Sequence, residues 1–300
     1  MQALNSPKLS HHFHLDAHAD YLSWRAQKLA AYPLELLITE IKNPYQLTSS
    51  ERTQLLTQCQ KVNFALYQFT ADTPVDKTTL QALATQLGLT RIDRHLIADE
   101  TGITALQVAS HGQAQAYIPY TNRPLNWHTD GYYNPFSQQV HAILMHCVRP
   151  ALQGGESQLF DHELAYIQLR DQNPDYIAAL MAPQAMTVPA NHKDGVEIRP
   201  LQSGPVFSIH SPSNTLHMRY TARSRHIIWP QDAPTQAALT ALTQLFQDAS
   251  PYIVRHRLTT NQGIVCNNIL HSRSKFTEGD TVEQQRLLYR IRFLDRISAP

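Results

Sequence analysis

The sequence predicts a mainly β protein with inserted helices, an α+β fold whose core is a barrel or a sandwich. The chain has 300 residues, of which 42% are hydrophobic, so it is long enough for one large domain with a sizeable core. From residue 105 onward, short runs of alternating apolar and polar residues are separated by polar turns. Helical spacing of apolar residues is confined to a few segments, which favours an arrangement of many strands over a doubly wound sheet.

Residues near the amino end are expected to form a helical layer. Apolar residues recur at helical spacing in residues 16–31 and 49–62, and Thr48-Ser49-Ser50-Glu51 offers N-cap residues followed by an acid in the first turn. We therefore divide the chain into an N-terminal helical region, residues 1–61, packed on a β-rich domain, residues 62–300.

The remaining elements alternate between strands and helices. Each expected strand alternates in hydrophobicity, and each expected helix has a 3.6-residue period or a recognisable start and stop. The predicted strands are residues 62–69, 106–109, 113–118, 140–148, 206–209, 215–220, 263–266 and 287–293, and the further helices are residues 76–88, 162–170, 175–181 and 234–247.

Charge and cysteine content narrow the class of protein. The 25 basic and 24 acidic residues give a net charge of +1 without long charged blocks, which argues against a nucleic-acid partner and favours a small-molecule substrate. The three cysteines form no C-x-x-C pair, so neither a disulfide framework nor a thiolate zinc site is expected. The first residues lack an apolar leader and no stretch is long enough for a bilayer, so we expect a cytoplasmic protein without a membrane partner.

Sixteen histidines are unusual, and several crowd the amino end. A metal-binding tract and a solvated histidine-rich arm both fit this composition, and we favour the arm. We assign it no function.

The segment Asn126-Trp127-His128-Thr129-Asp130 carries the first candidate metal ligands. On a strand, alternate side chains share one face, so Asn126, His128 and Asp130 would point into one cavity. An isolated H-x-D is a weak signal, and a histidine hydrogen-bonded in a turn is its ordinary alternative. His271, which follows the predicted strand at residues 263–266, adds a second imidazole, and two histidines with one carboxylate suit an Fe(II) site that keeps open positions.

Four motifs in order then resemble one known family. They are Asn126-Trp127-His128-Thr129-Asp130; Leu144-Met145-His146-Cys147 leading to Gly154-Gly155-Glu156-Ser157; Asn268-Ile269-Leu270-His271-Ser272-Arg273; and Arg286 with Arg290. Over roughly residues 62–293 the chain resembles the taurine catabolism dioxygenase family of Fe(II)- and 2-oxoglutarate-dependent oxygenases, which includes the γ-butyrobetaine and trimethyllysine hydroxylases.

The resemblance implies a double-stranded β-helix, or jelly roll, with His128, Asp130 and His271 as the iron ligands. It implies 2-oxoglutarate as cosubstrate, with Arg286 and Ser157 binding its far carboxylate. It also implies a hydroxylase that uses O₂ and decarboxylates 2-oxoglutarate to succinate and CO₂. No catalytic residue beyond the metal ligands is expected.

Arg290 is a second candidate for the arginine that binds 2-oxoglutarate. Residues 276–281 make the stretch before Arg286 look longer than in taurine dioxygenase, which leaves the assignment of Arg286 over Arg290 open. Arg290 is therefore a further candidate for contact with the cosubstrate or with an acidic group of the substrate. An arginine suits either role because its planar fork matches a carboxylate.

Several residues are candidates for contact with the substrate. Asn126 shares the expected ligand face, and Tyr132 and Tyr133, with Phe136 nearby, could cage a quaternary amine by cation–π attraction. The alternative is ordinary aromatic packing, which we favour. Arginines in residues 216–225 could attract an acid or form a solvated face, and residues 191–195 could form a lid. We therefore expect a small-molecule substrate that is an amine or an acidic metabolite.

Other functions stay open beside the hydroxylase. A desaturase of the same family, a non-catalytic module that binds metal and 2-oxoglutarate, and a zinc hydrolase would all use the same ligands. No G-x-S-x-G, G-x-G-x-x-G or P-loop motif supports a serine hydrolase, nicotinamide or nucleotide-binding reading. The sequence leaves open the substrate, the carbon that is oxidised and whether the chain forms a homo-oligomer.

Overall fold

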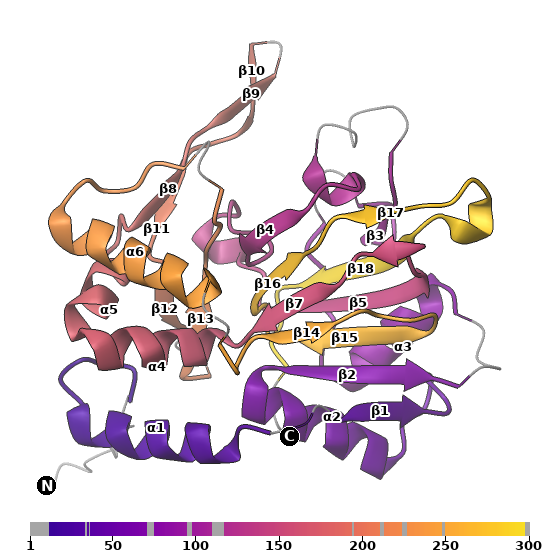
Figure 1. The fold of residues 1–300 in the computed structure, drawn as a ribbon, viewed down its shortest axis with the longest axis horizontal. Coiled ribbons are helices and arrows are strands. Elements are labelled where there is room, and N and C mark those ends of the chain that lie inside the picture. Colours follow the sequence, from indigo (N-terminus) through magenta and orange to yellow (C-terminus); the bar gives the residue numbers. More distant parts are fainter. Residues whose placement is uncertain are drawn as a thin grey trace, which may run out of the picture.

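The computed structural model describes residues 12–33, 35, 37–70, 75–94, 98–109, 117–193, 195–210, 213–223, 227–247 and 250–297. These residues form a mixed α/β fold (Figure 1). Its α-helices within the described ranges are α1 (His18–Ala31), α2 (Ser49–Val62), α3 (Lys77–Gln86), α4 (His162–Gln172), α5 (Pro174–Leu180) and α6 (Ala233–Gln247).

Two sheets form the centre of the fold. The larger has six strands in the order β1-β2-β15-β5-β18-β3, and the smaller has four in the order β14-β7-β16-β4. Only β1 and β2 pair in parallel among these neighbours. The larger sheet comprises β1 (Ile38–Ile41), β2 (Phe64–Phe69), β15 (Gln262–Cys266), β5 (Ala142–Arg149), β18 (Leu287–Phe293) and β3 (Ile103–Leu106), and the smaller comprises β14 (Val254–His256), β7 (Ser157–Phe160), β16 (Leu270–Arg273) and β4 (Leu125–His128).

Four antiparallel pairs complete the strands of the described ranges. One of them, β9 with β10, projects from the body of the molecule as a hairpin (Figure 1). The pairs are β6 (Gln153–Gly154) with β17 (Phe276–Thr277), β8 (Met186–Val188) with β11 (Gln202–Gly204), β9 (Asn191–Lys193) with β10 (Val196–Arg199), and β12 (Phe207–His210) with β13 (Thr215–Met218).

The larger sheet is buried on both faces. Along β5, Ile143 and Met145 belong to the apolar cluster that also contains Leu159 of the smaller sheet, so this cluster fills the space between the sheets. Leu144 points the other way and packs with residues of α2 and α3. Side chains of β5 point to the two faces in turn because a strand has a two-residue period. The smaller sheet and the inner face of the larger sheet therefore face each other across one apolar layer.

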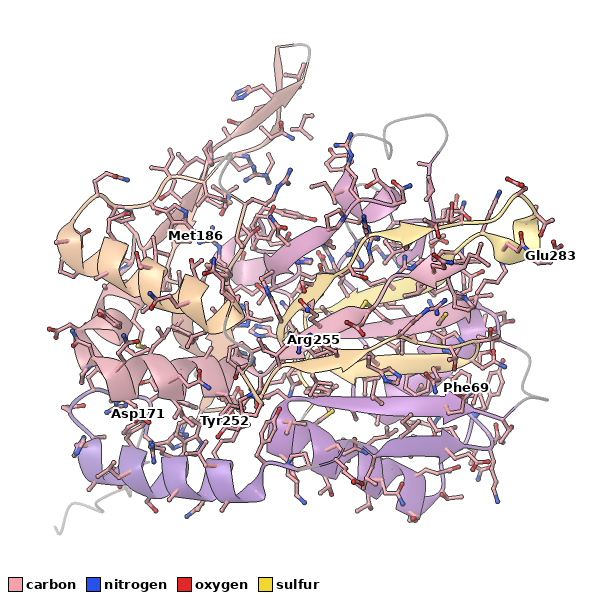
Figure 2. The ribbon with its side chains drawn as sticks, viewed as in Figure 1. Phe69, Asp171, Met186, Tyr252, Arg255 and Glu283 are labelled. Carbon is pink, nitrogen blue, oxygen red and sulfur yellow. The ribbon has the colours of Figure 1, made fainter. Side chains whose placement is uncertain are left out.

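A second body of helices lies beside the sheets and includes α1, α4, α5 and α6 (Figure 1). Helix α1 is attached to α4 by polar contacts: Tyr21 donates to Asp171 at 2.7 Å, and buried Lys28 pairs with Asp161 and Glu163 at 2.6 Å each. Asp171 lies over α1 in the side-chain view (Figure 2). The two carboxylates offset the cost of burying the Lys28 ammonium.

The six predicted helices are confirmed, with bounds that differ by a few residues. Local signals suffice there: Thr48 and Glu51 form a capping box at the start of α2, and Asp76 caps α3. Strands β2, β5, β12, β13, β15 and β18 fall on predicted strands, whereas the strand expected at residues 106–109 ends at Leu106. Of the strand expected at residues 113–118, residues 113–116 lie outside the described ranges, and Ile118 begins a 3-10 turn.

Further expectations have mixed outcomes. Cys59, Cys147 and Cys266 are free and buried. Strand β1 lies within the N-terminal region and pairs in the larger sheet, and the division at residue 62 stays a prediction. His11 of the histidine-rich end lies outside the described ranges, whereas His12 stacks on Trp24 with ring centroids 4.7 Å apart. None of the helices in the described ranges has the length and apolar character needed to cross a membrane.

Candidate metal centre

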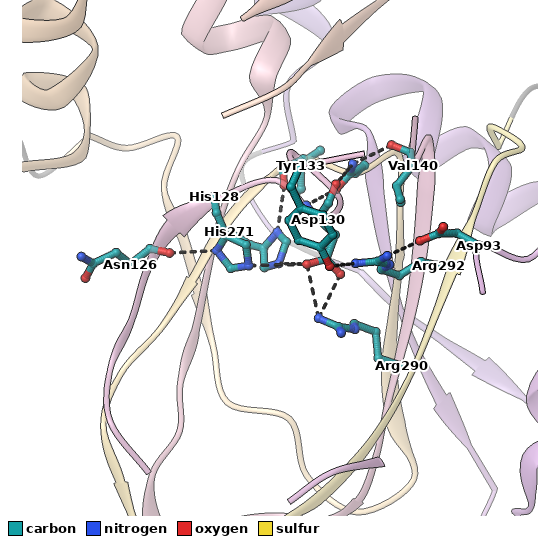
Figure 3. Close-up of polar contacts among 11 residues, drawn as sticks. Asp93, Asn126, His128, Asp130, Tyr133, Val140, His271, Arg290 and Arg292 are labelled. Atoms are coloured by element: carbon teal, nitrogen blue, oxygen red, sulfur yellow. Dashed lines mark hydrogen bonds and ion pairs between the residues drawn. The ribbon is translucent and has the colours of Figure 1, made fainter. Parts of the chain in front are cut away.

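His128 and His271 face each other across two neighbouring strands. Strand β16 pairs antiparallel with β4 in a register that sets His271 opposite His128, and their ring centroids lie 4.2 Å apart. Asp130 lies just beyond β4, and its Oδ1 is 3.5 Å from His128 Nε2 and 4.0 Å from His271 Nε2 (Figure 3). One ligand atom from each residue lies within 4.8 Å of the others, and all three side chains are buried.

Hydrogen bonds set the direction in which each imidazole presents its lone pair. His128 Nδ1 donates to the backbone carbonyl of Asn126 at 2.8 Å, and His271 Nδ1 donates to that of Ile269 at 2.9 Å. A carbonyl only accepts, so the proton of each neutral ring is on Nδ1 and the lone pair is on Nε2. Both Nε2 atoms face Asp130, and this donor set fits a divalent metal held by two imidazoles and a carboxylate.

Asn268 holds the backbone that carries Asp130. Its side-chain oxygen accepts from Asp130 N at 2.8 Å, and its amide nitrogen donates to the carbonyls of Asp130 at 2.9 Å and Val140 at 2.6 Å. The next residue, Gly131, has φ +65°, and a Cβ there would lie 2.5 Å from Val140 Cγ2. A left-handed, tightly packed turn therefore requires glycine at this position, and the turn directs Asp130 towards the imidazoles.

The charges at the centre suit a metal cation. Burial would raise the pKa of Asp130, but Arg290, His128 and His271 hold that pKa well below its usual value. Arg290 Nη1 lies 3.1 Å from Asp130 Oδ2. Burial, with His128 nearby, lowers the pKa of His271 to about 4. At neutral pH the centre therefore presents a charged carboxylate and a neutral imidazole at His271, the forms that bind metals.

Arg286 and Ser157 line one recess, together with Gly155, Arg257 and Leu288. The Arg286 guanidinium lies 5.0 Å from the ring centroid of Phe276, and Arg273 approaches the same ring at 4.8 Å. Burial lowers the pKa of Arg286 to about 10, so it remains a cation at neutral pH. Among the described residues no carboxylate lies within ion-pair distance of its guanidinium, which leaves the recess suited to an anion.

Arg290 lies elsewhere, against Asp130, on the same inward face of β18 as Arg292. The longer stretch before Arg286 folds back against it, because the side chain of Glu278 accepts a hydrogen bond from the backbone N–H of Arg286 at 2.8 Å. The two arginines thus occupy different surroundings, one in the recess with Ser157 and the other at the candidate metal ligands.

The expected substrate residues are spread over different surroundings. Asn126 has an exposed side chain and does not share the buried face of His128, because the pairing of β4 with β16 shifts register between Leu125 and His128. It contributes its backbone carbonyl instead. Tyr132 and Tyr133 are half-buried with ring centroids 5.3 Å apart, and Phe136 is 69% exposed. Their roles towards a substrate stay predictions.

Other predicted candidates have structural partners. Arg219 donates to the carbonyls of Tyr132, Met186 and Gln202, so it fastens strands to the turn after Asp130. Ser224 and Arg225 lie outside the described ranges. His146 is buried against Tyr67, with Nδ1 3.1 Å from the phenol oxygen, and His162 approaches the Leu216 carbonyl.

Sequence reasoning missed Asn268 as a supporting residue, although it lies in the motif that includes His271. It also missed the pair Arg292–Asp93, with Tyr133 accepting from Arg292 at 2.8 Å (Figure 3). Asp93 is distant in sequence and belongs to no motif, so the sequence did not indicate it. Arg292 could have been found, because residues two apart on a strand share a face and Arg290 was already a candidate.

The model of the family described as "Taurine catabolism dioxygenase TauD, TfdA family" matches residues 39–292. The chain belongs to this family. This confirms the predicted resemblance and the predicted enzyme class, an oxidoreductase of the dioxygenase type. It also agrees with Fe(II) and 2-oxoglutarate as the cofactors, which the buried His-Asp-His set fits.

Two curated relatives are named uridine-5'-phosphate dioxygenase. The one from Amycolatopsis sp is 28% identical over 171 residues, covering 55% of this chain and 58% of the relative, so the match spans less than two thirds of that protein. The one from Streptomyces sp is 26% identical over 201 residues, covering 64% of this chain and 69% of the relative.

Among solved structures, the non-heme iron oxygenase OrfP in complex with Fe and alpha-ketoglutaric acid has a similar fold. Its TM-score is 0.59 at 14% identity, and the match covers 83% of this chain and 81% of that chain. At this identity the likeness concerns the fold alone.

Proposed function

We propose that the protein is an Fe(II)- and 2-oxoglutarate-dependent dioxygenase that hydroxylates a small acidic molecule. The observation that carries the proposal is that His128 Nε2, His271 Nε2 and Asp130 Oδ1 lie close enough to bind one metal ion. The chain also belongs to a family of dioxygenases. Bound Fe(II) and 2-oxoglutarate would supply oxidation of a substrate C–H bond by O₂, with decarboxylation of 2-oxoglutarate to succinate and CO₂.

The proposal includes a double-stranded β-helix core. It is supported by the order of the strands, because β4, β7 and β16 of the smaller sheet alternate along the chain with β3, β5, β15 and β18 of the larger one. Such an arrangement brings residues from distant strands to one end of the core, which is where β4 and β16 carry His128 and His271.

The residues of the chain have separate tasks in this proposal. His128, Asp130 and His271 hold the metal, while Arg286 and Ser157 bind the far carboxylate of 2-oxoglutarate in their recess. Arg286 suits this task because a guanidinium makes two parallel charge-assisted hydrogen bonds with a carboxylate. Leu288 and Cys147 line the same recess and exclude water from the cosubstrate.

The arginines favour an acid over an amine as substrate. Arg292 and Arg199 already lie 5.6 and 5.9 Å from the ring centroid of Tyr133, so a quaternary ammonium at that ring would meet two like charges. Phe136, the third ring of the expected cage, faces solvent. The curated relatives are named for uridine-5'-phosphate, which carries an acidic phosphate group. A nucleoside phosphate is therefore the first substrate class to test.

The proposed activity is tested by measuring succinate and the oxidised substrate together. Anaerobically prepared protein is given Fe(II), ascorbate, 2-oxoglutarate and O₂ with a panel of phosphate esters, sulfonates, carboxylic acids and amines. Succinate above the substrate-free background, matched by an oxidised product, is expected for an acid. Amines as the only active class would contradict the acidic substrate, and a missing absorption band on adding 2-oxoglutarate to the iron protein would contradict the cosubstrate.

The alternatives from the sequence differ in the same assay. A desaturase would form succinate and an unsaturated product. A non-catalytic module would bind 2-oxoglutarate and leave oxygen consumption at background, and a zinc hydrolase would show no 2-oxoglutarate-dependent band.

A further inference from the structure

Tyr120 carries an unpaired hydroxyl in the space between the two sheets that carry the candidate metal ligands and the arginines. It ends the 3-10 turn Ile118–Tyr120, and it is 5% exposed within the apolar cluster between the two sheets. Its hydroxyl oxygen is buried and has no hydrogen-bond partner within the described ranges. Buried polar groups are nearly always paired, so an unpaired hydroxyl between the two sheets that bound the site points to a group that a ligand completes.

The backbone holds Tyr120 in place without help from the hydroxyl. Ala109 N donates to the Tyr120 carbonyl at 3.0 Å, and Arg273 Nη2 donates to the carbonyl of Thr121 at 2.8 Å. Ala109 follows β3, which pairs with β18 so that Thr104 lies opposite Arg290. The hydroxyl is therefore positioned in advance by the strands that also carry the arginines of the site, and it contributes nothing to its own placement.

The charges that act on the Tyr120 hydroxyl come from the site itself. Burial raises the pKa of Tyr120, Arg290 opposes that rise, and Tyr133 and Asp130 add to it, with the net effect upward. The hydroxyl is therefore protonated at neutral pH and is able to donate a hydrogen bond.

Space for a ligand adjoins this residue. Tyr120 lines a cavity of about 290 Å³ together with Ala109, Ile118 and Arg123. That volume is near the lower end of the range for small-molecule sites. The recess with Arg286 and Ser157 is separate, because Tyr120 is not among its lining residues. A contact with the substrate therefore fits Tyr120 better than a contact with the far carboxylate of 2-oxoglutarate.

The charge balance of the interior indicates what kind of group Tyr120 meets. Arg290 has Asp130 as its ion-pair partner, but a metal bound to Asp130 would compete for that carboxylate. Arg273 is 7% exposed, and its guanidinium bonds to backbone carbonyls without a carboxylate within ion-pair distance in the described ranges. Buried cations need counter-charges, so an anionic substrate would be stabilised here.

Resting on the function proposed above, we propose that Tyr120 is a substrate-positioning residue: its hydroxyl donates a hydrogen bond to a negatively charged oxygen of the substrate, beside the Arg290 guanidinium. A phosphate ester is the class of substrate that this pair suits, since it offers one oxygen to the neutral donor and another to the cation.

The test removes one oxygen atom. Tyr120→Phe keeps the ring that packs between the sheets, and uridine 5'-phosphate and 2-oxoglutarate are the probes. We expect the KM for uridine 5'-phosphate to rise roughly 10-fold or more, from loss of a hydrogen bond to a charged group. We also expect succinate to exceed oxidised product, because a loosely held substrate is misaligned, while the affinity for 2-oxoglutarate stays unchanged.

Tyr289→Phe is the matched control, since Tyr289 lies on the outward side of β18 and should change none of these quantities. An unchanged KM and unchanged ratio of succinate to product in Tyr120→Phe would overturn the proposal. An equal loss of 2-oxoglutarate affinity would overturn it as well, by moving the contact to the cosubstrate.

A second measurement separates this inference from the proposed function. Calorimetry of the Fe(II)- and 2-oxoglutarate-loaded protein with inorganic phosphate reports anion binding without turnover. Binding by the wild type that weakens roughly 10-fold in Tyr120→Phe supports the inference even if no substrate yields succinate. Equal affinity in both proteins, or no binding by the wild type, overturns it.

Discussion

His128 with His271, and His141 with His210 and His217, form two groups of neighbouring imidazoles at similar spacing. The ring centroids lie 4.2 Å apart in the first group, and 4.5 and 4.7 Å from His141 in the second. In the first group both Nδ1 atoms donate to carbonyls and both Nε2 atoms face a carboxylate.

The second group lacks that order. His141 Nδ1 has no partner within the described ranges, and His210 Nδ1 lies 2.7 Å from Ser213 Oγ. Within those ranges only His128, Asp130 and His271 bring three ligand atoms together. Ring proximity alone therefore does not make a metal site; oriented lone pairs and a carboxylate do.

The largest effect should separate the two groups outright. His271→Ala should abolish iron retention and Asp130→Ala should abolish hydroxylation, because each removes a ligand from the metal. His217→Gln should leave the iron content at the wild-type level. Iron per protein chain is measured by mass spectrometry and turnover by succinate. Normal iron and turnover in both ligand variants would show that the triad is misassigned.

The next largest effect is expected at Arg286 and Arg290, which lie in different surroundings, one in the recess with Ser157 and the other against Asp130. Arg286→Gln should raise the KM for 2-oxoglutarate roughly 10- to 100-fold, because it loses charge-assisted hydrogen bonds worth about 1.5–3 kcal/mol. Arg290→Gln should raise it much less, since Arg290 lies against Asp130. Steady-state kinetics at varied 2-oxoglutarate measure the ranking, and the reverse order would transfer the role to Arg290.

A smaller effect concerns the support of the ligands. Asn268→Gly removes the amide that holds the Asp130 backbone but tolerates the φ of +48° at this position. Loss of such a support should weaken iron affinity about 10- to 100-fold. Asn214→Gly, at φ +53° in the β12–β13 turn, is the matched control. A titration with Fe(II) gives both affinities, and equal values would remove Asn268 from the site's support.

The smallest effect belongs to the second histidine group. Burial, with His210 and Arg296 nearby, lowers the pKa of His141 to about 4, and burial together with His141 holds the pKa of His217 well below its usual value. Between pH 6.5 and about 4 the unfolded chain binds more protons than the folded one, so stability falls as the pH falls through this window.

His141→Gln should therefore make the free energy of unfolding less dependent on pH by up to about 1.4 kcal/mol per pH unit within that window. Urea unfolding at several pH values measures the slope, with an unchanged slope at neutral pH as the internal control. An unaltered slope below pH 6 would show that His141 is already protonated in the folded protein.

Elements stabilised by interactions between residues close in sequence could be predicted, and elements that depend on distant residues could not. Helix α2 could be placed to the residue because its capping box and its period are contained in its own sequence. The strands β8 to β11 were not predicted, since each has only three or four residues and pairs mainly by backbone hydrogen bonds. The shared face expected for Asn126 failed because the pairing of β4 with β16 shifts register between Leu125 and His128, an irregularity that the local sequence does not announce.

By itself, the sequence determined the helices, the main strands of the larger sheet, and His128, Asp130 and His271 as one candidate set, because capping, periodicity and motif order are local or ordered properties of the chain. Only the tertiary structure decided that His271 lies opposite His128, that Asn268 holds Asp130 and that the Tyr120 hydroxyl is left unpaired between the two sheets. These relations depend on strand register and on packing between residues far apart in sequence, and the free energy of burial is decided only when the sheets come together.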